Sequence, residues 1–309
     1  MTRRRAPEPP GASGFLVVDK PSGLTSHDVV DAARRALRTR RVGHLGTLDP
    51  QATGVLPLAI RDATKLVPFL AAGRKLYRGA IQLGVETDTL DGDGRRTREH
   101  EGRLPDEAAV RAALAAFVGE IEQVPPMYSA VKKDGVALHR LARRGQEVER
   151  APRRVRIDRL ELLRFAAPTV EIEVACSAGT YVRVLAADLG ARLGCGAFLA
   201  SLRRLASGPF RIEDAIPFAL LEQAREAGPA DVEARLVPPV TALGLPTLSL
   251  GPEAARRIAH GAEIATPPGV PASTRVAALG PDGELLAVLE ARPGRLLGPV
   301  RVLSGSSRS

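Results

Sequence analysis

The residues best suited to chemistry in this sequence lie in one short loop around Asp49. The stretch 41–58 reads RVGHLGTLDPQATGVLPL, in which this single carboxylate lies between glycines and directly before Pro50. Glycines such as Gly46 let the backbone approach a ligand closely, and Pro50 biases Asp49 away from helical dihedral angles. The apolar run 55–60 anchors the segment in something buried. The pattern is typical of an active-site loop, although an Asp-Pro pair more often simply opens a turn.

Further blocks rich in Gly, Asp, Lys, Arg and Tyr follow one another between residues 15 and 205. They read FLVVDKPSGLTS from Phe15, DATK from Asp62, KLYR from Lys75, GVETDTLDGDG from Gly84, PPMYSAVK from Pro125, GTYVR from Gly179 and LRRL from Leu202. In this order, and together with the Asp49 loop, they resemble the signature of the TruB family of tRNA pseudouridine synthases. So many matches in one order are far more specific than any short motif.

The resemblance implies an enzyme that isomerises uridine 55 in the T arm of tRNA to pseudouridine, without a cofactor. This reaction breaks the N-glycosidic bond, turns the uracil while it is held, and joins its C5 atom to the sugar. It needs a carboxylate or charge stabiliser near C1′, a proton acceptor for C5, and a base lifted out of the RNA helix. By resemblance Asp49 is the essential carboxylate, acting either as a covalent nucleophile or through a glycal-type intermediate.

Four more residues match positions in the family's pocket. Arg183 matches the arginine that pairs with the aspartate, and such a pair keeps a partly desolvated carboxylate ionised. Tyr77 matches the tyrosine that stacks on the target base and helps to remove the C5 proton. Tyr181 and Leu202 match further pocket residues, of which Leu202 covers the base. Without the resemblance, Arg183 would be interpreted as a helix cap or a surface residue, and the other three as packing residues.

The resemblance also assigns four residues to contacts with RNA. His44 matches the histidine that inserts into the RNA stack once the base has left, because an imidazole is flat enough to replace a base. Lys20 and Lys65 are expected to neutralise phosphates, and Lys132 begins a basic segment. Elsewhere, a histidine in a glycine-rich loop is usually only a polar loop residue, and a lysine is usually on the surface.

The composition favours a polyanionic partner. The 309 residues include 44 Lys and Arg against 35 Asp and Glu, for a net charge of +9, so nucleic acid is the first expectation and an acidic membrane surface the second. No apolar run approaches the roughly 18 residues of a membrane span, and no hydrophobic segment follows the basic start. We therefore expect a cytoplasmic protein, monomeric and without an obligatory protein partner, that binds tRNA and no membrane.

Neither the cysteines nor the histidines have the spacing of a metal site. Cys176 lies in an alternating, strand-like run and Cys195 between glycines, and the five histidines are scattered. There is no phosphate-binding loop and no dinucleotide fingerprint. The sequence thus predicts reduced, structural thiols, no metal, and chemistry performed by side chains alone.

Strand-like and helix-like patterns alternate irregularly along the chain. Residues 15–19, 77–83 and 170–175 have strand-like patterns, Thr25 to Asp28 fits a capping box, and 106–118 has helical spacing. Such an irregular order predicts an α+β fold with a mixed sheet. The resemblance implies the pseudouridine synthase fold, whose central sheet is mainly antiparallel.

The chain is expected to form two folded units between two short tails. Residues 1–13 and 304–309 are basic or polar and are expected to be disordered. Residues 14–243 form the expected catalytic unit, and 246–303, beyond a Pro- and Gly-rich boundary, a small one with a capped helix from Pro252. In a TruB-like chain this second position holds a PUA domain, a small β-barrel that binds RNA, here expected on the acceptor stem.

The strongest basic cluster lies in a segment at about 125–156. From Lys132 to Arg156 there are nine Lys or Arg against three acids, an excess of six positive charges. Residues 136–144 have helical spacing, and glycines and a proline punctuate the edges. We interpret the segment as a basic lobe that is laid over RNA, and a solvated helix face is the alternative.

Three other functions fit parts of the same sequence. The first is a pseudouridine synthase of the archaeal and eukaryotic type that works in a guide-RNA particle, although the complete basic lobe and the lack of long charged tails favour a stand-alone enzyme. The second is a tRNA-binding folding factor, against which the joint presence of Asp49, Tyr77 and Arg183 argues. The third is an RNA N-glycosidase, which would release free uracil.

Overall fold

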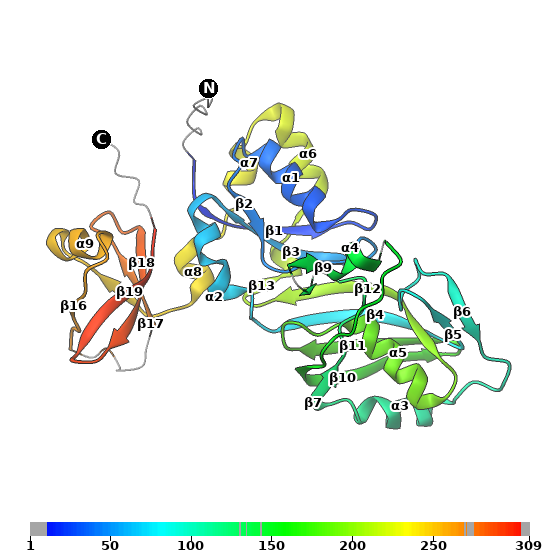
Figure 1. The fold of residues 1–309 in the computed structure, drawn as a ribbon. Coiled ribbons are helices and arrows are strands. Elements are labelled where there is room, and N and C mark those ends of the chain that lie inside the picture. Colours follow the sequence, from blue (N-terminus) through cyan, green and yellow to red (C-terminus); the bar gives the residue numbers. More distant parts are fainter. Residues whose placement is uncertain are drawn as a thin grey trace.

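The computed structural model describes residues 11–129, 131–133, 135–142, 144–268, 270 and 275–303, and the side chains of 132, 133, 137 and 139 are outside this description. The tail 304–309 and most of the tail 1–13 lie outside it as well. The described chain has an α+β fold built on a ten-stranded and a five-stranded sheet, with two small hairpins (Figure 1). Within it, no helix combines the length and the apolar composition that crossing a membrane would take.

The ten-stranded sheet is mixed and mainly antiparallel, as the sequence and the resemblance predicted. Its main path runs through β14 (Ile216–Pro217), β1 (Gly14–Lys20), β3 (Thr53–Ile60), β12 (Ala197–Ser207), β4 (Lys75–Leu83), β11 (Thr169–Cys176), β10 (Arg153–Ala166) and β7 (Gly119–Gln123). β2 (Val42–His44) pairs with β3, and β13 (Phe210–Arg211) with β12. Only the pairs β1–β14 and β3–β12 are parallel.

Helices cover one face of this sheet. The first is α1 (Ser26–Ala36), which begins with the predicted capping box, because Thr25 and Asp28 bond to each other's backbone N–H. The others are α3 (Glu107–Ala115), α5 (Val182–Leu193), α6 (Phe218–Ala227) and α7 (Ala230–Glu233). Buried residues of these helices and of the sheet form one hydrophobic cluster, which includes Val29 of α1 and Leu185 of α5. A single core therefore supports both halves of the sheet.

The other face of β1 and β3 joins the two sheets. It is covered by η1 (Arg61–Leu66), α2 (Val67–Leu70), η2 (Ile212–Asp214) and α8 (Pro239–Leu243). The same hydrophobic cluster includes Leu70 and Ala242 together with Ala277 and Val288 of the C-terminal sheet. Because this apolar surface is shared, the C-terminal sheet is docked on the first and not merely tethered to it.

The C-terminal sheet is half of a barrel. Its order is β15 (Thr247–Ser249), β17 (Arg275–Leu279), β18 (Leu285–Arg292), β19 (Leu296–Val302) and β16 (Ile264–Ala265). The helix expected from Pro252 is present as α9 (Pro252–Ala259) and packs on the sheet. The outer strands β15 and β16 do not pair with each other in the described residues, so the curled sheet stays open.

Two hairpins extend from the central sheet. The first pairs β5 (Val85–Thr87) with β6 (Arg96–Glu99), and the second pairs β8 (Lys132–Lys133) with β9 (Val136–Ala137). A helix is present within 136–144, but it is shorter than this spacing predicted, because β9 precedes α4 (Leu138–Ala142). In the described residues, the basic lobe therefore contains a hairpin followed by a short helix.

One glycine allows the two halves of the central sheet to meet. β3 and β12 pair over only two residues, Thr53 with Arg203 and Gly54 with Arg204. Gly54 has a φ of +97°, and a Cβ atom there would lie 2.2 Å from the carbonyl oxygen of Arg204. Only glycine permits both this backbone conformation and this approach.

We predict that Gly54→Ala lowers the free energy of unfolding by about 2 to 4 kcal/mol, because both a clash and a left-handed backbone oppose the methyl group. Gly43→Ala is the matched control, since no atom lies within 4 Å of a Cβ added at Gly43. Urea unfolding of the two variants measures the difference. Equal stabilities would show that β3 and β12 separate without cost.

Candidate active site

Asp49 lies in the loop between β2 and β3, and backbone bonds fix this loop on both sides of it. The hydroxyl of Ser26 donates to the Leu48 carbonyl at 3.0 Å and accepts from the Leu48 N–H at 2.8 Å. The Gly23 N–H donates to the carbonyl of Pro50 at 2.9 Å, and the Ala52 N–H to that of Asp49 at 3.1 Å. The carboxylate is thus mounted on a rigid turn, whose shape does not depend on a ligand.

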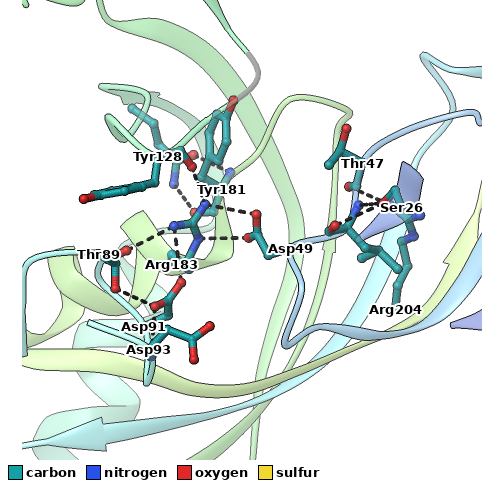
Figure 2. Close-up of polar contacts among 12 residues, drawn as sticks. Ser26, Thr47, Asp49, Thr89, Asp91, Asp93, Tyr128, Tyr181, Arg183 and Arg204 are labelled. Atoms are coloured by element: carbon teal, nitrogen blue, oxygen red, sulfur yellow. Dashed lines mark hydrogen bonds and ion pairs between the residues drawn. The ribbon is translucent and has the colours of Figure 1, made fainter. Parts of the chain in front are cut away.

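Arg183 holds the carboxylate from the first turn of α5. Its Nε lies 2.9 Å from Oδ2 of Asp49, and its Nη2 lies 3.2 Å from Oδ1. The guanidinium side chain is 5% exposed and also donates to the carbonyl oxygens of Thr89 at 3.1 Å and Tyr128 at 2.9 Å (Figure 2). Such a two-pronged contact fixes the direction of the carboxylate as well as its charge.

The Asp49 side chain is still 40% exposed, so it is open to a ligand. Burial raises the pKa of Asp49 above its usual range, and the charge of Asp91 adds to this, whereas Arg183 and Lys20 act in the opposite direction. The carboxylate is therefore partly desolvated, but the positive charges of Arg183 and Lys20 stabilise it. This is the condition in which a carboxylate reacts or stabilises a nearby positive charge most strongly.

Asp91 is a second partner of Arg183, and the sequence analysis missed it. Its Oδ2 lies 3.3 Å from Nη1 of Arg183, and its Oδ1 accepts from the hydroxyl of Thr89 at 2.5 Å. Asp91 lies in the turn between β5 and β6, inside the block that begins at Gly84. That block holds three aspartates, and the sequence does not indicate which of them forms an ion pair with the arginine. The folded structure shows that it is Asp91.

Tyr77 extends from β4 and is 8% exposed. Burial raises the pKa of Tyr77, and the charge of Arg204 opposes this shift. Asp49 is near enough to act on the same pKa. The structure thus brings Tyr77, Asp49 and Arg183 to one place, with the phenol kept in its neutral form.

His44 ends β2 and is partly buried. Its Nδ1 accepts a hydrogen bond from the Gly46 N–H at 3.3 Å. Burial lowers the pKa of His44, and the charges of Arg204 and His27 lower it further. The ring is therefore neutral at pH 7, the state that stacks on bases without a charge to desolvate.

Tyr181 lies at the start of α5, the helix that carries Arg183, and Leu202 lies in β12. Tyr181 is the N-cap of α5, and its backbone exchanges two hydrogen bonds with the Gln123 side chain, at 3.0 and 3.3 Å. Figure 2 shows its ring beside Arg183. Leu202 is a partly buried residue of β12 that packs against the main core.

The expectation that Lys20 contacts phosphates is wrong. The residue is 0% exposed, and its ammonium group donates to the carbonyl oxygens of Pro21 at 2.8 Å, Leu24 at 2.7 Å and Pro50 at 2.9 Å. All three of its N–H bonds are thus used inside the protein. Lys20 fixes the turn that carries Asp49 and adds positive charge behind it.

The other two lysines lie in η1 and β8. Lys65 lies in η1, is 30% exposed, and forms an ion pair with Asp62 at 3.1 Å. Arg41 pairs with the same aspartate. Lys132 lies in β8, and its side chain is outside the described part of the structure.

The cluster contains no arrangement for a metal ion. Among the described residues, no three His, Cys, Asp or Glu side chains are grouped so that they could hold one. Cys176 and Cys195 are buried, free thiols. The chemistry available at this site is that of a carboxylate, an arginine and a buried phenol.

Comparison with known structures defines the class of protein. A crystal structure of a Cbf5-Nop10-Gar1 complex matches with a TM-score of 0.70 and 29% identity over 94% of this chain and 84% of that one. The structure of an H/ACA RNP bound to a substrate RNA containing 2'-deoxyuridine matches with a TM-score of 0.71 and 26% identity over 95% and 86%. The fold is that of the pseudouridine synthases.

Sequence comparison defines the family. A model described as TruB family pseudouridylate synthase (N terminal domain) matches residues 34–182, and one described as tRNA pseudouridylate synthase B C-terminal domain matches residues 183–243. A tRNA pseudouridine synthase B of Geobacter sulfurreducens is 46% identical over 91% of this chain and 94% of its own length. One of Opitutus terrae is 50% identical over 73% and 92%. The chain belongs to the TruB family, which makes it an isomerase.

We predict a rise in stability with pH that depends on Lys20. Burial lowers the pKa of Lys20 from 10.5 to about 8. Between these values the unfolded chain binds more protons than the folded one. The stability of the wild type relative to Lys20→Met should therefore increase with pH, by up to about 1.4 kcal/mol per unit.

Urea unfolding at pH values from about 7 to about 10 measures this difference. Lys65→Met, which removes a partly exposed lysine, is the control, and any trend common to both variants is subtracted. A difference between the wild type and Lys20→Met that stays level over this range would contradict the prediction.

Proposed function

We propose that this protein converts uridine 55 in the T arm of tRNA to pseudouridine, as a stand-alone enzyme without a cofactor. The observation that carries the proposal is the open carboxylate of Asp49, fixed by a buried Arg183 next to a buried tyrosine. The relatives named tRNA pseudouridine synthase B support tRNA as the substrate. The net charge of +9 is that of a protein with a polyanionic partner.

Asp49 acts at the sugar of a uridine that has been flipped out of the RNA. The C1′–N1 bond breaks, the uracil turns, C1′ bonds to C5, and the proton lost from C5 is balanced by one gained at N1. Asp49 either attacks C1′ or stabilises the positive charge that develops on the sugar. Tyr77 faces the detached base and helps to remove the C5 proton, while Leu202 and Tyr181 enclose it.

Arg183 keeps Asp49 in its reactive direction. Because its other contacts are Asp91 and two carbonyl oxygens, it stays fixed when Asp49 engages the substrate. His44, neutral and at the end of β2, fills the place of the flipped base in the RNA stack. The sequence of events therefore needs no large movement within the protein's pocket.

The basic lobe closes on the RNA from the side of Tyr128. Its two ends are tied together, since Arg150 donates to the Pro125 carbonyl at 3.3 Å. The Tyr128 carbonyl accepts from Arg183, so the base of the lobe is bonded to the active-site arginine itself. Exposed arginines of the lobe, such as Arg144 and Arg153, contact phosphates.

Residues 246–303 act as a PUA-like RNA-binding unit on the acceptor stem. Exposed arginines lie on its helix α9 and strand β19, including Arg256 and Arg301. The enzyme is expected to work as a monomer in the cytoplasm. The guide-RNA alternative is less favoured because the structures of that type share only 26% and 29% identity with this chain.

We predict that Asp49→Asn abolishes pseudouridine formation and leaves tRNA affinity near the wild-type value. Asparagine keeps the shape of the loop but offers neither a nucleophile nor a full charge. Arg183 retains Asp91 as a partner, so the loss of stability should be well below the roughly 3 to 5 kcal/mol of an orphaned buried charge. Tritium release from C5-labelled uridine in tRNA and filter binding measure the two properties.

Asp93→Asn is the matched control, because Asp93 lies two residues beyond Asp91 and is exposed. It should retain both binding and tritium release. Appreciable release by Asp49→Asn would show that the catalytic group lies elsewhere. Free uracil among the products of the wild type would instead identify an N-glycosidase.

We predict that charge reversals in the two basic regions weaken RNA binding differently for long and short RNA. Arg153→Glu should weaken binding to whole tRNA and to a T-arm stem-loop alike, and should lower the salt slope by about one unit. Arg256→Glu should weaken binding to whole tRNA alone. Arg225→Glu, at an exposed position of α6, is the control. Filter binding over a range of salt decides, and equal losses for Arg256→Glu on both RNAs would contradict the placement of α9.

A further inference from the structure

Arg204 is a buried cation beside the site that the chemistry outlined above does not use. It lies in β12 and is 1% exposed, the largest of the fully buried side chains. No carboxylate pairs with it among the residues that the structure describes. Its Nε donates to the Val55 carbonyl at 2.6 Å, Nη2 to Gly46 at 3.1 Å and Nη1 to Thr47 at 3.5 Å.

These three carbonyl groups lie on both sides of Asp49 in the chain. Gly46 and Thr47 belong to the turn that leads into Asp49, and Val55 belongs to the strand that follows. Figure 2 shows Thr47 and Arg204 on the same side of this turn. A guanidinium is a planar fork with donors at fixed angles. The turn therefore cannot shift relative to β3 without losing bonds that are sheltered from water.

The same side chain neighbours Tyr77, and its charge opposes the effect of burial on the pKa of the phenol. In the sheet, Arg204 of β12 lies directly opposite Tyr77 of β4. One side chain thus connects the turn that carries Asp49 with the tyrosine that faces the base.

The backbone of Arg204 is fixed as firmly as its side chain. Gly54 of β3 pairs with it and approaches so closely that a Cβ atom would lie 2.2 Å from its carbonyl oxygen. The neighbouring Arg203 has a different role, because it is 41% exposed and pairs with Asp19 at 2.7 and 3.0 Å. The two adjacent arginines therefore form a natural pair for comparison.

We propose that Arg204 is a positioning residue for the isomerisation, which holds Asp49 and Tyr77 in one geometry on either side of the target base before RNA binds. This inference rests on the proposed function. It assigns the preorganisation of the site to a residue that contacts neither the reacting atoms nor RNA. Its removal should therefore slow the reaction and leave the binding of tRNA unchanged.

Arg204→Lys tests this role, because lysine keeps the buried charge and loses the planar fork. We expect kcat to fall by about 10- to 100-fold with KM and tRNA affinity unchanged, the loss that a displacement of about 1 Å produces. Arg204→Gln, which also loses the charge, should be slower still. Arg203→Lys is the matched control and should keep the wild-type kcat.

A double-mutant cycle with Tyr77→Phe separates positioning from general stability. If Arg204 acts through the phenol, the loss from Arg204→Lys should be smaller in the Tyr77→Phe background than in the wild type. Rates are expressed per folded molecule, with the folded fraction measured by circular dichroism, so that partial unfolding does not imitate a slower reaction.

Three results would overturn the inference: a wild-type kcat per folded molecule in Arg204→Lys, a raised KM with unchanged kcat, or losses that simply add in the cycle. A wild-type enzyme that forms no pseudouridine would refute the proposed function instead, and the two failures are therefore distinct. Carbodiimide-blocked reverse transcription of a tRNA transcript provides that separate readout.

Discussion

The bond between Arg183 and Asp49 is the constraint on which the rest of the site depends. A guanidinium that is 5% exposed must have its charge and its donors satisfied within the protein. The chain meets this demand with the turn of Asp49, the hairpin turn of Asp91 and the Tyr128 carbonyl at the base of the basic lobe. Three segments far apart in the sequence therefore converge on one arginine.

A second requirement is that the loop of Asp49 keeps its shape while one side of it faces solvent. Ser26, Lys20 and Arg204 bind its backbone from α1, β1 and β12 respectively. Of these elements, β1 and β12 belong to the two halves of the central sheet, which meet at Gly54. The site therefore lies at the join of the two halves, and the single core that packs the helices against both halves also holds the residues of the candidate site together.

Much of the local structure could be predicted from the sequence because it depends on neighbouring residues. The capping box at Thr25, the strand at 170–175 and the display of Asp49 before Pro50 are examples. The roles of Lys20, Asp91 and Arg204 could not, because they depend on partners distant in the chain. Lys20 has the side chain of a surface residue, and only the folded loop brings Pro50 and Leu24 to its ammonium group. Alternation along a strand implies that Arg203 and Arg204 face opposite sides, but not which one is buried.

The positively charged side chains of this protein are of two kinds, buried ones and exposed ones, and the two kinds contribute differently to RNA binding. Lys20, Lys75, Arg183 and Arg204 are each at most 6% exposed, and they bind carbonyl or carboxylate oxygens of the protein. A cation that is already dehydrated and bonded inside the fold releases no counterion from a phosphate when RNA arrives. The salt dependence of RNA binding must therefore come from cations that are exposed on the surface. The net charge of the sequence consequently overstates the number of phosphate contacts, and the buried share of it is what organises the active site.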